Sequence, residues 1–325
     1  MPDRLDPARL FRSSDPDALY DQLLKDLERD KEAIPVITGP TASGKSSLAM
    51  RLAQERGGEI ISCDAMQVYR GFDIGTAKPD TRDQLAVKHH MLDILEPCQT
   101  MTVAAFTRQA SDLIQELLDQ GIKPILCGGS VQYVSALLDG LIFLDIPPDP
   151  ALRRQIAQEI EARGLEASWR MMAQMDPKAA RTIDPADRRR LGRFFEIYQQ
   201  TGLTKTEPNR RSRERGPAFL FSAFWLDRSP REALYQVIND RVEAMWERGL
   251  KLEVKALMDR HPDYGNCPAF RGIGYREMVE HLEGRLDEEE AKALMARSTR
   301  RYAKRQQTWL RKRLDLSVLL YQLSE

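Results

Sequence analysis

The stretch Gly39-Pro40-Thr41-Ala42-Ser43-Gly44-Lys45-Ser46 constrains the fold most, because it fits the pattern G-x-x-x-x-G-K-[ST]. It follows a short β-branched run, residues 34–38, and precedes a helical pattern over about 46–56. A loop of this kind turns consecutive backbone N–H groups onto an anion at the helix N-terminus. Lys45 then reaches the outer phosphate, and the Ser46 hydroxyl can hold Mg²⁺. The motif predicts a polyphosphate ligand without identifying it; a chance glycine turn is the alternative.

Short apolar runs elsewhere predict further strands of the same sheet. Residues 59–63 and 123–127 are such runs, and helical patterns such as 102–118 separate them. Strands that alternate with helices are typical of a parallel sheet covered on both faces. The fold class we predict is therefore α/β, a P-loop NTPase-like parallel sheet with helices on both faces.

The second half of the chain changes character. Residues 147–217 carry helical patterns, many charges and no convincing strand, which indicates an inserted all-helical domain. Residues 218–227 return to a buried-strand pattern, 229–257 predict one capped amphipathic helix, and about 288–313 a long basic helix. We expect four parts: an N-terminal helical extension (1–33), the first part of the core (34–146), the helical insert (147–217), and the completed core with basic C-terminal helices (218–325).

The overall composition excludes several classes of protein. The chain has 49 basic and 49 acidic residues, 42% hydrophobic residues, and no apolar run near the roughly 20 residues that span a bilayer. Its first residues lack the apolar segment of a secretory signal. Its four cysteines lack a C-x-x-C pattern, which argues against a zinc site or a disulfide framework. We expect a cytoplasmic protein, monomeric by default and without an obligate protein partner.

Two polar side chains follow strands of the predicted sheet. Asp64 comes after 59–63, and Ser130 closes a Gly-Gly turn after 123–127. Open α/β sheets bind ligands at the carboxyl ends of their strands, so both lie where a ligand is expected. Asp64 could ligate Mg²⁺ or act as a general base. In the alternative interpretation Asp64 is a helix cap or solvated turn residue, and the Gly-Gly turn serves tight geometry alone. Gln67 and Tyr69 could contact a nucleobase, or be ordinary loop residues.

Basic charge gathers in two segments although the net charge is zero. Between Arg181 and Arg215 ten basic residues face five acidic ones, and residues 297–314 contain no acidic residue. Arg300 and Arg301 belong to a basic set that recurs at spacings of three and four. Basic clusters with nearby aromatics favour a nucleic-acid backbone as partner, with a solvated helix face as the alternative. Binding should therefore be local.

These residues together identify a family, because the chain resembles bacterial tRNA dimethylallyltransferases. The resemblance runs in order from about residue 34 to 313. Besides the P-loop, it rests on Asp64-Ala65-Met66-Gln67-Val68-Tyr69, on the segments 73–79, 89–95 and 271–275, on Ile197-Tyr198 with Thr201-Gly202, and on 299–306 with Thr308-Trp309.

The resemblance implies a reaction and its partners. A dimethylallyl group passes from dimethylallyl diphosphate to N6 of adenosine 37, in tRNAs that read codons beginning with U, and diphosphate leaves. Asp64 takes the amine proton. Lys45, Mg²⁺ held by Ser46, the loop amides and Arg271 stabilise the leaving group. The helical insert grips the anticodon stem-loop while the base is flipped out.

The family's site residues fall on definite positions here. The resemblance implies Asp64, Ser130 and Arg271 as catalytic residues and Gly39 to Ser46 as the diphosphate-binding or nucleotide-binding loop. Its implied tRNA-binding set is Asp64, Ala65, Met66, Gln67, Ser130, Arg153, Arg189, Arg190, Leu191, Gly192 and Arg193, to which the basic helix adds Arg300 and Arg301.

Several positions depart from the family pattern. The family generally has Gly-Gly-Thr-Gly-Leu-Tyr where this chain has Gly128-Gly129-Ser130-Val131-Gln132-Tyr133, so the hydroxyl is kept and a glycine is lost. Ala65 replaces a usual serine, and Arg189 a commoner glutamine. Two other functions remain open from the residues: a P-loop small-molecule kinase that uses ATP, and an inactive RNA-binding protein on the same scaffold.

Overall fold

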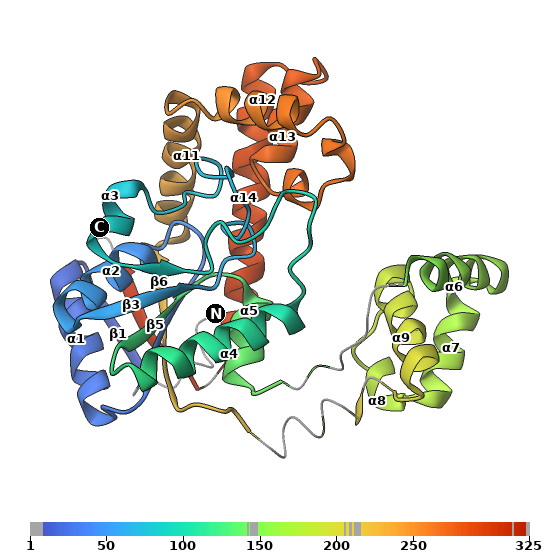
Figure 1. The fold of residues 1–325 in the computed structure, drawn as a ribbon, viewed down its shortest axis with the longest axis horizontal. Coiled ribbons are helices and arrows are strands. Elements are labelled where there is room, and N and C mark those ends of the chain that lie inside the picture. The colour runs from blue at the N-terminus through green and yellow to red at the C-terminus, as the bar shows by residue number, and fades with distance from the viewer. Residues whose placement is uncertain are drawn as a thin grey trace. The chain divides into compact units, whose positions relative to one another are not determined.

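A seven-stranded sheet forms the centre of the first of two compact units (Figure 1). The computed structural model describes residues 9–141, 143, 149–204, 206–207, 210, 216–313 and 315–322. The strands are β1 Leu10–Ser13, β2 Ile34–Thr38, β3 Gly58–Ser62, β4 His89–His90, β5 Lys123–Gly128, β6 Phe221–Ser229 and β7 Ser317–Gln322. Their order is β1-β7-β6-β2-β5-β3-β4, and all neighbouring strands pair in parallel, which confirms the predicted fold class.

The register of the central strands brings the P-loop and the turn after β5 together at one edge, beside the end of β6. Thr38, the last residue of β2, lies opposite Gly128 of β5 and Trp225 of β6. The P-loop therefore leaves the sheet between the turn that follows β5 and the last residues of β6. This is the carboxyl edge, where open α/β sheets bind ligands.

Helices of this unit cover the sheet and extend beyond it. They are α1 Pro16–Arg29, α2 Lys45–Arg56, α3 Thr81–Ala86, α4 Val103–Asp119, α5 Val131–Leu138, α11 Arg231–Glu247, α12 Leu250–Arg260, α13 Tyr275–Leu282 and α14 Glu288–Leu310, with 3₁₀ turns η2 Tyr264–Asn266 and η3 Pro268–Arg271. Apolar residues of α1 and α2 pack with β2, β5 and β6 in one core. A second core, around Phe72 and Tyr275, joins α11 to α14 with the loop after β3. In Figure 1, α14 runs from this second group of helices back to the strands.

The second compact unit, residues 136–218, has helices and turns but no strand in its described part. Its helices are α6 Pro150–Arg163, α7 Leu165–Met175, α8 Pro177–Ala180 and α9 Arg188–Thr201. Isoleucines of α6 and the two phenylalanines of α9 form its core. The boundary that we expected at 147 lies outside the described residues, so the four-part division stays a prediction.

The structure corrects several sequence-based expectations about secondary structure. The helix expected over 229–257 is two helices, because Gly249, at φ 94°, adopts the left-handed conformation that ends α11 and precedes α12. The basic helix ends at Leu310, and β7 follows it. The extension contains β1 besides its helix, and β1 pairs with β7 from the other end of the chain. Pairing between chain ends has no local sequence signal.

The expectation that the cysteines form no disulfide is wrong. Cys98 and Cys267, separated by 169 positions, form a disulfide with a Cα–Cα distance of 4.0 Å. The bond joins the loop after β4 to the turn that leads into η3. Cys63 and Cys127 are free and buried. No helix in the described part of the chain has the length and apolarity needed to cross a membrane.

Candidate active site

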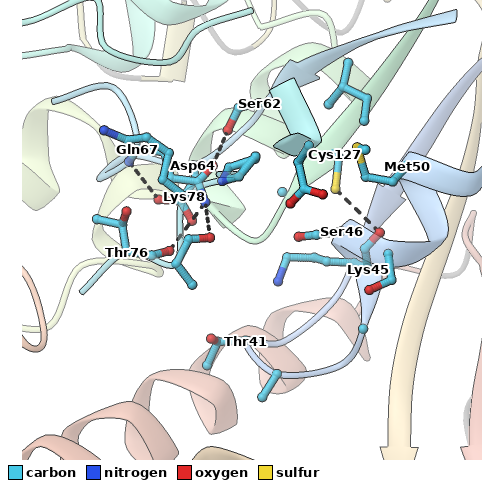
Figure 2. Close-up of a pocket in the computed structure, with 18 of the residues that line it drawn as sticks. Thr41, Lys45, Ser46, Met50, Ser62, Asp64, Gln67, Thr76, Lys78 and Cys127 are labelled. Carbon is cyan, nitrogen blue, oxygen red and sulfur yellow. Dashed lines mark hydrogen bonds between the residues drawn. The ribbon is translucent and has the colours of Figure 1, made fainter. Parts of the chain in front are cut away.

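The P-loop turns around the N-terminus of α2, in the geometry that its sequence predicts. Gly39 has no room for a side chain, since a Cβ there would lie 2.2 Å from the Leu226 carbonyl oxygen. Ala42 has φ 66°, and Gly44, at φ 97°, caps the helix. The loop borders a cavity of about 720 Å³, which is lined among others by Thr41, Ala42, Gly44, Lys45, Ser46, Asp64, Arg228 and Arg241. Figure 2 labels Thr41, Lys45, Ser46 and Asp64 on its wall. Backbone N–H groups at a helix N-terminus make this cavity suited to an anion.

Lys45 places an ammonium group in this cavity. Its Nζ donates a hydrogen bond to the Pro40 carbonyl at 3.3 Å. Burial lowers the pKa of Lys45, while Cys127 and Asp64 oppose that shift. A lysine that loses hydration without a carboxylate in contact gains most from an incoming anion. Ser43 is buried, and its hydroxyl has no hydrogen-bond partner among the described residues.

Asp64 lies on the wall shared by this cavity and a second one of about 320 Å³. It follows β3 directly, as expected. Its Oδ1 accepts hydrogen bonds from the backbone N–H groups of Met66 at 2.8 Å and Gln67 at 3.4 Å. No hydrogen bond from a described residue is recorded for Oδ2. One oxygen thus fixes the carboxylate, and the other can accept a proton.

Ser130 supports the loop that carries Asp64. Its Oγ accepts a hydrogen bond from the Ala65 N–H at 2.9 Å, and its own N–H donates to the Cys63 carbonyl at 3.2 Å. Gly128 permits this approach, because a Cβ there would lie 2.3 Å from the Cys63 carbonyl oxygen. The Gly-Gly turn therefore positions the Asp64 loop, in addition to allowing the backbone to turn tightly.

The second cavity brings together all three residues proposed as catalytic. Asp64, Ser130 and Arg271 line it, and Arg271 reaches it from η3. Ala65 and Met66 line it as well, with apolar side chains of α11 and α14: Ile238, Val242, Met245 and Met295. An apolar chamber with a carboxylate and a guanidinium at its wall suits a flat, partly polar group such as a nucleobase.

Arg241 of α11 lines both cavities, and the sequence analysis missed it. Burial lowers the pKa of Arg241, with the nearby Asp64 opposing the shift. No ion pair with a described residue is recorded for it. A signal was present: Arg241 follows Leu234 by seven and Ile238 by three positions, so it occupies the buried stripe of its helix. A charged residue on such a stripe indicates a function.

The C-terminal helix α14 attaches directly to both turns of the site, a second feature that was missed. The Gln306 side chain, 2% exposed, accepts a hydrogen bond from the Thr41 N–H at 2.9 Å and donates one to the Gly129 carbonyl at 2.7 Å. Tyr302 lines both cavities, and burial raises its pKa to about 12. The helix expected to bind RNA is therefore also bonded to the P-loop and to the turn after β5.

The two residues suggested as nucleobase contacts are engaged within the protein. The Gln67 amide accepts a hydrogen bond from the Ser62 hydroxyl at 2.9 Å and donates to the carbonyls of Thr76 and Ala77. Tyr69 is 5% exposed in the second core, which makes base stacking by this ring wrong. Gln67 holds the loop that carries Asp64 against the segment 76–77.

The basic face expected on α14 is largely exposed. Arg297, Arg301, Lys304 and Arg305 are exposed, whereas Arg300 is half-buried and donates to the Asn239 side chain at 2.6 Å. No ion pair to a described carboxylate is recorded for these five residues. Arg305 also lines the second cavity. Uncompensated positive charge therefore continues from the helix surface to the site.

In the helical unit, two of the residues implied to bind tRNA share one buried carboxylate. Glu196, with a side chain 4% exposed, forms ion pairs with Arg153 at 2.8 Å and Arg193 at 2.7 Å. Both guanidinium groups remain about half-exposed. Glu196 thus fixes their direction without covering them.

The other implied positions of this unit differ in exposure. Arg189 is exposed, Arg190 is exposed and pairs with Asp187 at 3.2 Å, and Gly192 is half-buried. Leu191 is fully buried in the unit's core, so its side chain is not available to RNA. Four members of the basic cluster lie outside the described residues: Lys205, Arg211, Arg213 and Arg215.

The cavity offers few ligands for a metal ion. Among the described residues, no three histidine, cysteine, aspartate or glutamate side chains gather as a metal-binding group. The oxygen donors on the wall beside the P-loop include the Ser46 hydroxyl and the Asp64 carboxylate. These are hard donors, which suit Mg²⁺ when phosphate oxygens and water complete its coordination.

Comparison with known proteins assigns the chain to a family. The family model described as IPP transferase matches residues 67–313. A tRNA dimethylallyltransferase of Chlorobaculum parvum is 42% identical and covers 91% of this chain and 95% of its own. One of Thermus thermophilus is 41% identical, with coverages of 86% and 90%.

Solved structures agree with this assignment. A tRNA isopentenylpyrophosphate transferase of Bacillus halodurans matches with a TM-score of 0.64 at 36% identity, over 90% of this chain and 91% of its own. A eukaryotic dimethylallyltransferase described as acting on tRNA matches with a TM-score of 0.76 at 28% identity, over 90% of this chain and 74% of its own. Because the family model spans most of the sequence and the relatives align over nearly their full lengths, this chain belongs to the IPP transferase family.

Proposed function

We propose that this chain acts as a tRNA dimethylallyltransferase. It transfers the dimethylallyl group from dimethylallyl diphosphate to N6 of adenosine 37, in tRNAs that read codons beginning with U, and releases diphosphate. The observation that carries the proposal is the position of Asp64, on the wall between the P-loop cavity and the apolar second cavity. One carboxylate can therefore face a phosphate ester on one side and an acceptor on the other.

Asp64 serves as the base in this proposal. The adenine amine attacks C1 of the dimethylallyl group, the C1–O bond to diphosphate breaks, and the amine loses a proton. Oδ2 accepts that proton, while Oδ1 stays fixed by the Met66 and Gln67 N–H groups. An exocyclic amine conjugated with its ring is a weak nucleophile, so removal of the proton as the bond forms lowers the barrier.

The leaving diphosphate is stabilised from several sides. The N–H groups at the start of α2 and the Lys45 ammonium face the growing negative charge. Arg241 faces it from α11, because it borders the same cavity. Both cations are partly desolvated, which strengthens their attraction to an anion. Thr41 contributes its side chain, since its N–H is already bonded to Gln306.

Magnesium fits this arrangement as a cofactor. Ser46 is the residue that would hold it, and Asp64 lies on the same cavity wall. When bound, Mg²⁺ supplies charge neutralisation of the diphosphate oxygens. The protein's own residues position the phosphate ester and take the proton.

In this proposal the basic surfaces bind the RNA. The exposed cations of α14 lead to the second cavity through Arg305 and Arg271. Arg153, Arg189 and Arg193 of the helical unit present further cations. Such contacts bind the phosphate backbone and repay the energy of taking a base out of its stack. A cytoplasmic location and a monomeric state stay predictions.

A transfer assay tests this proposal. The protein is incubated with Mg²⁺, labelled dimethylallyl diphosphate and a tRNA whose anticodon loop carries adenosines at positions 36 to 38. We expect label in the RNA, and none in a matched tRNA with guanosine at position 37. Absence of label together with turnover of ATP on a small acceptor would establish a kinase instead.

A further inference from the structure

Arg228 lies against the outer side of the P-loop, at the end of β6. Its Nε donates a hydrogen bond to the Ala42 carbonyl at 3.1 Å. One of its terminal nitrogens is 3.7 Å from the position that a Cβ on Gly44 would take. On the other side, its guanidinium carbon lies 4.8 Å from the ring centre of Tyr321, its neighbour in register on β7. The side chain is thus held between the last strand and the loop.

The backbone that Arg228 contacts is in an unfavourable conformation. Ala42 has φ 66°, in the left-handed region where a Cβ is disfavoured. In a phosphate-binding loop this conformation turns N–H groups toward the anion and carbonyl groups away from it. A cationic donor on the outward carbonyl stabilises that arrangement before any ligand binds.

Arg228 also adds positive charge at the edge of the P-loop cavity. No ion pair between Arg228 and a described carboxylate is recorded, although its backbone N–H donates to Asp227 at 2.8 Å. Its side chain borders the same cavity as Lys45 and Ser46. Arg231, three residues later, is exposed and stacks on Tyr235 at 5.7 Å without bordering the cavity, so it provides a matched control.

We propose that Arg228 is a positioning residue for the diphosphate: it holds Ala42 in its left-handed conformation, so that the P-loop N–H groups point into the cavity. Tyr321 keeps the guanidinium plane in place. The inference rests on the proposed function for the identity of the anion. Residues of β6 and β7, which lie outside the P-loop motif, thereby take part in substrate binding.

Binding of inorganic diphosphate with Mg²⁺, measured by calorimetry, tests the proposal directly. We expect Arg228→Met to weaken diphosphate binding about tenfold, as loss of a charged hydrogen bond predicts. The KM for dimethylallyl diphosphate should rise by a similar factor, with the KM for tRNA unchanged. Arg228→Lys should recover part of the affinity, because it keeps the charge without the planar guanidinium. Arg231→Met should bind diphosphate like the wild type.

A suppressor variant separates positioning from general stability. Ala42→Gly in the Arg228→Met background should restore part of the affinity, because glycine adopts positive φ without the cost that alanine has. If the double variant binds no better than Arg228→Met, or if Arg228→Met binds diphosphate within about twofold of the wild type, the proposal is overturned.

The two proposals fail in different ways. Wild-type protein that binds diphosphate but transfers no prenyl group would contradict the proposed function alone. In that case the calorimetric comparison of Arg228→Met with Arg231→Met still decides the role of Arg228.

Discussion

The Ser130 hydroxyl accepts a hydrogen bond from the Ala65 N–H at 2.9 Å, and this bond joins the turn after β5 to the loop of Asp64. The family resemblance placed a hydroxyl at this position near the substrate. In the structure it bonds the loop backbone one residue beyond Asp64. The replacement of the family's usual threonine by serine keeps this hydrogen bond.

Removal of the Ser130 hydroxyl should therefore slow the reaction. In Ser130→Ala the Ala65 N–H loses its acceptor, which costs about 1–3 kcal/mol when water cannot replace it. We expect kcat to fall about tenfold as Asp64 loses its fixed position, with Ser130→Thr close to wild type. Ser135→Ala is the control, because that hydroxyl donates to the Val131 carbonyl of its own helix, away from the Asp64 loop. Equal kcat values for Ser130→Ala and Ser135→Ala would show that the bond does not position the base.

Glu196 should matter for RNA binding through the arginines that it holds. Glu196→Gln keeps the size of the side chain and removes the charge shared by Arg153 and Arg193. We expect the dissociation constant for tRNA, measured by fluorescence anisotropy, to rise roughly three- to tenfold, because both guanidinium groups lose their fixed direction. Binding of diphosphate should not change.

The opposite result for Glu196→Gln is equally informative. Tighter tRNA binding would mean that the carboxylate only neutralises positive charge. Glu166→Gln is a suitable control, since Glu166 pairs with Arg170 on the exposed surface of the same unit.

The stability of the core should fall in mild acid because of His89. Burial lowers the pKa of His89, although its hydrogen bond with the Val87 carbonyl at 2.8 Å opposes the shift. The unfolded chain therefore takes up a proton near pH 6.5 that the folded chain takes up only at lower pH. His89 contributes fully to the free energy of unfolding above its pKa in the unfolded chain. This contribution is lost as the pH falls toward its pKa in the folded chain.

Melting temperatures at pH 7.5 and pH 5.5 measure this effect. We expect the melting temperature of the wild type to fall between pH 7.5 and pH 5.5. It should fall less in His89→Gln, because glutamine does not take up a proton in this range. Equal drops in both proteins would assign the acid sensitivity to other groups.

Local motifs were enough to predict the P-loop, its strand and helix, and the place of Asp64 after β3. Their interactions join neighbours in sequence, so spacing alone reveals them. Long-range relationships were not predictable in the same way: the pairing of β1 with β7, the disulfide of Cys98 with Cys267, and the contact of Gln306 with Thr41. They depend on how distant segments fold together. Arg241 lies between these cases, because its position on the buried stripe of α11 is visible in the sequence.

The central claim is that Asp64, on the wall between the two cavities, accepts the proton of the adenine amine. The single-turnover rate of prenyl transfer by Asp64→Asn tests it. Asparagine keeps an oxygen for the Met66 N–H and cannot act as a base at neutral pH. We predict that transfer slows by about 10² to 10⁴, the usual contribution of a general base, while the dissociation constants for tRNA and diphosphate stay near wild type. Transfer at nearly the wild-type rate, or loss of tRNA binding to the same extent as loss of transfer, would contradict the account and make Asp64 a structural residue.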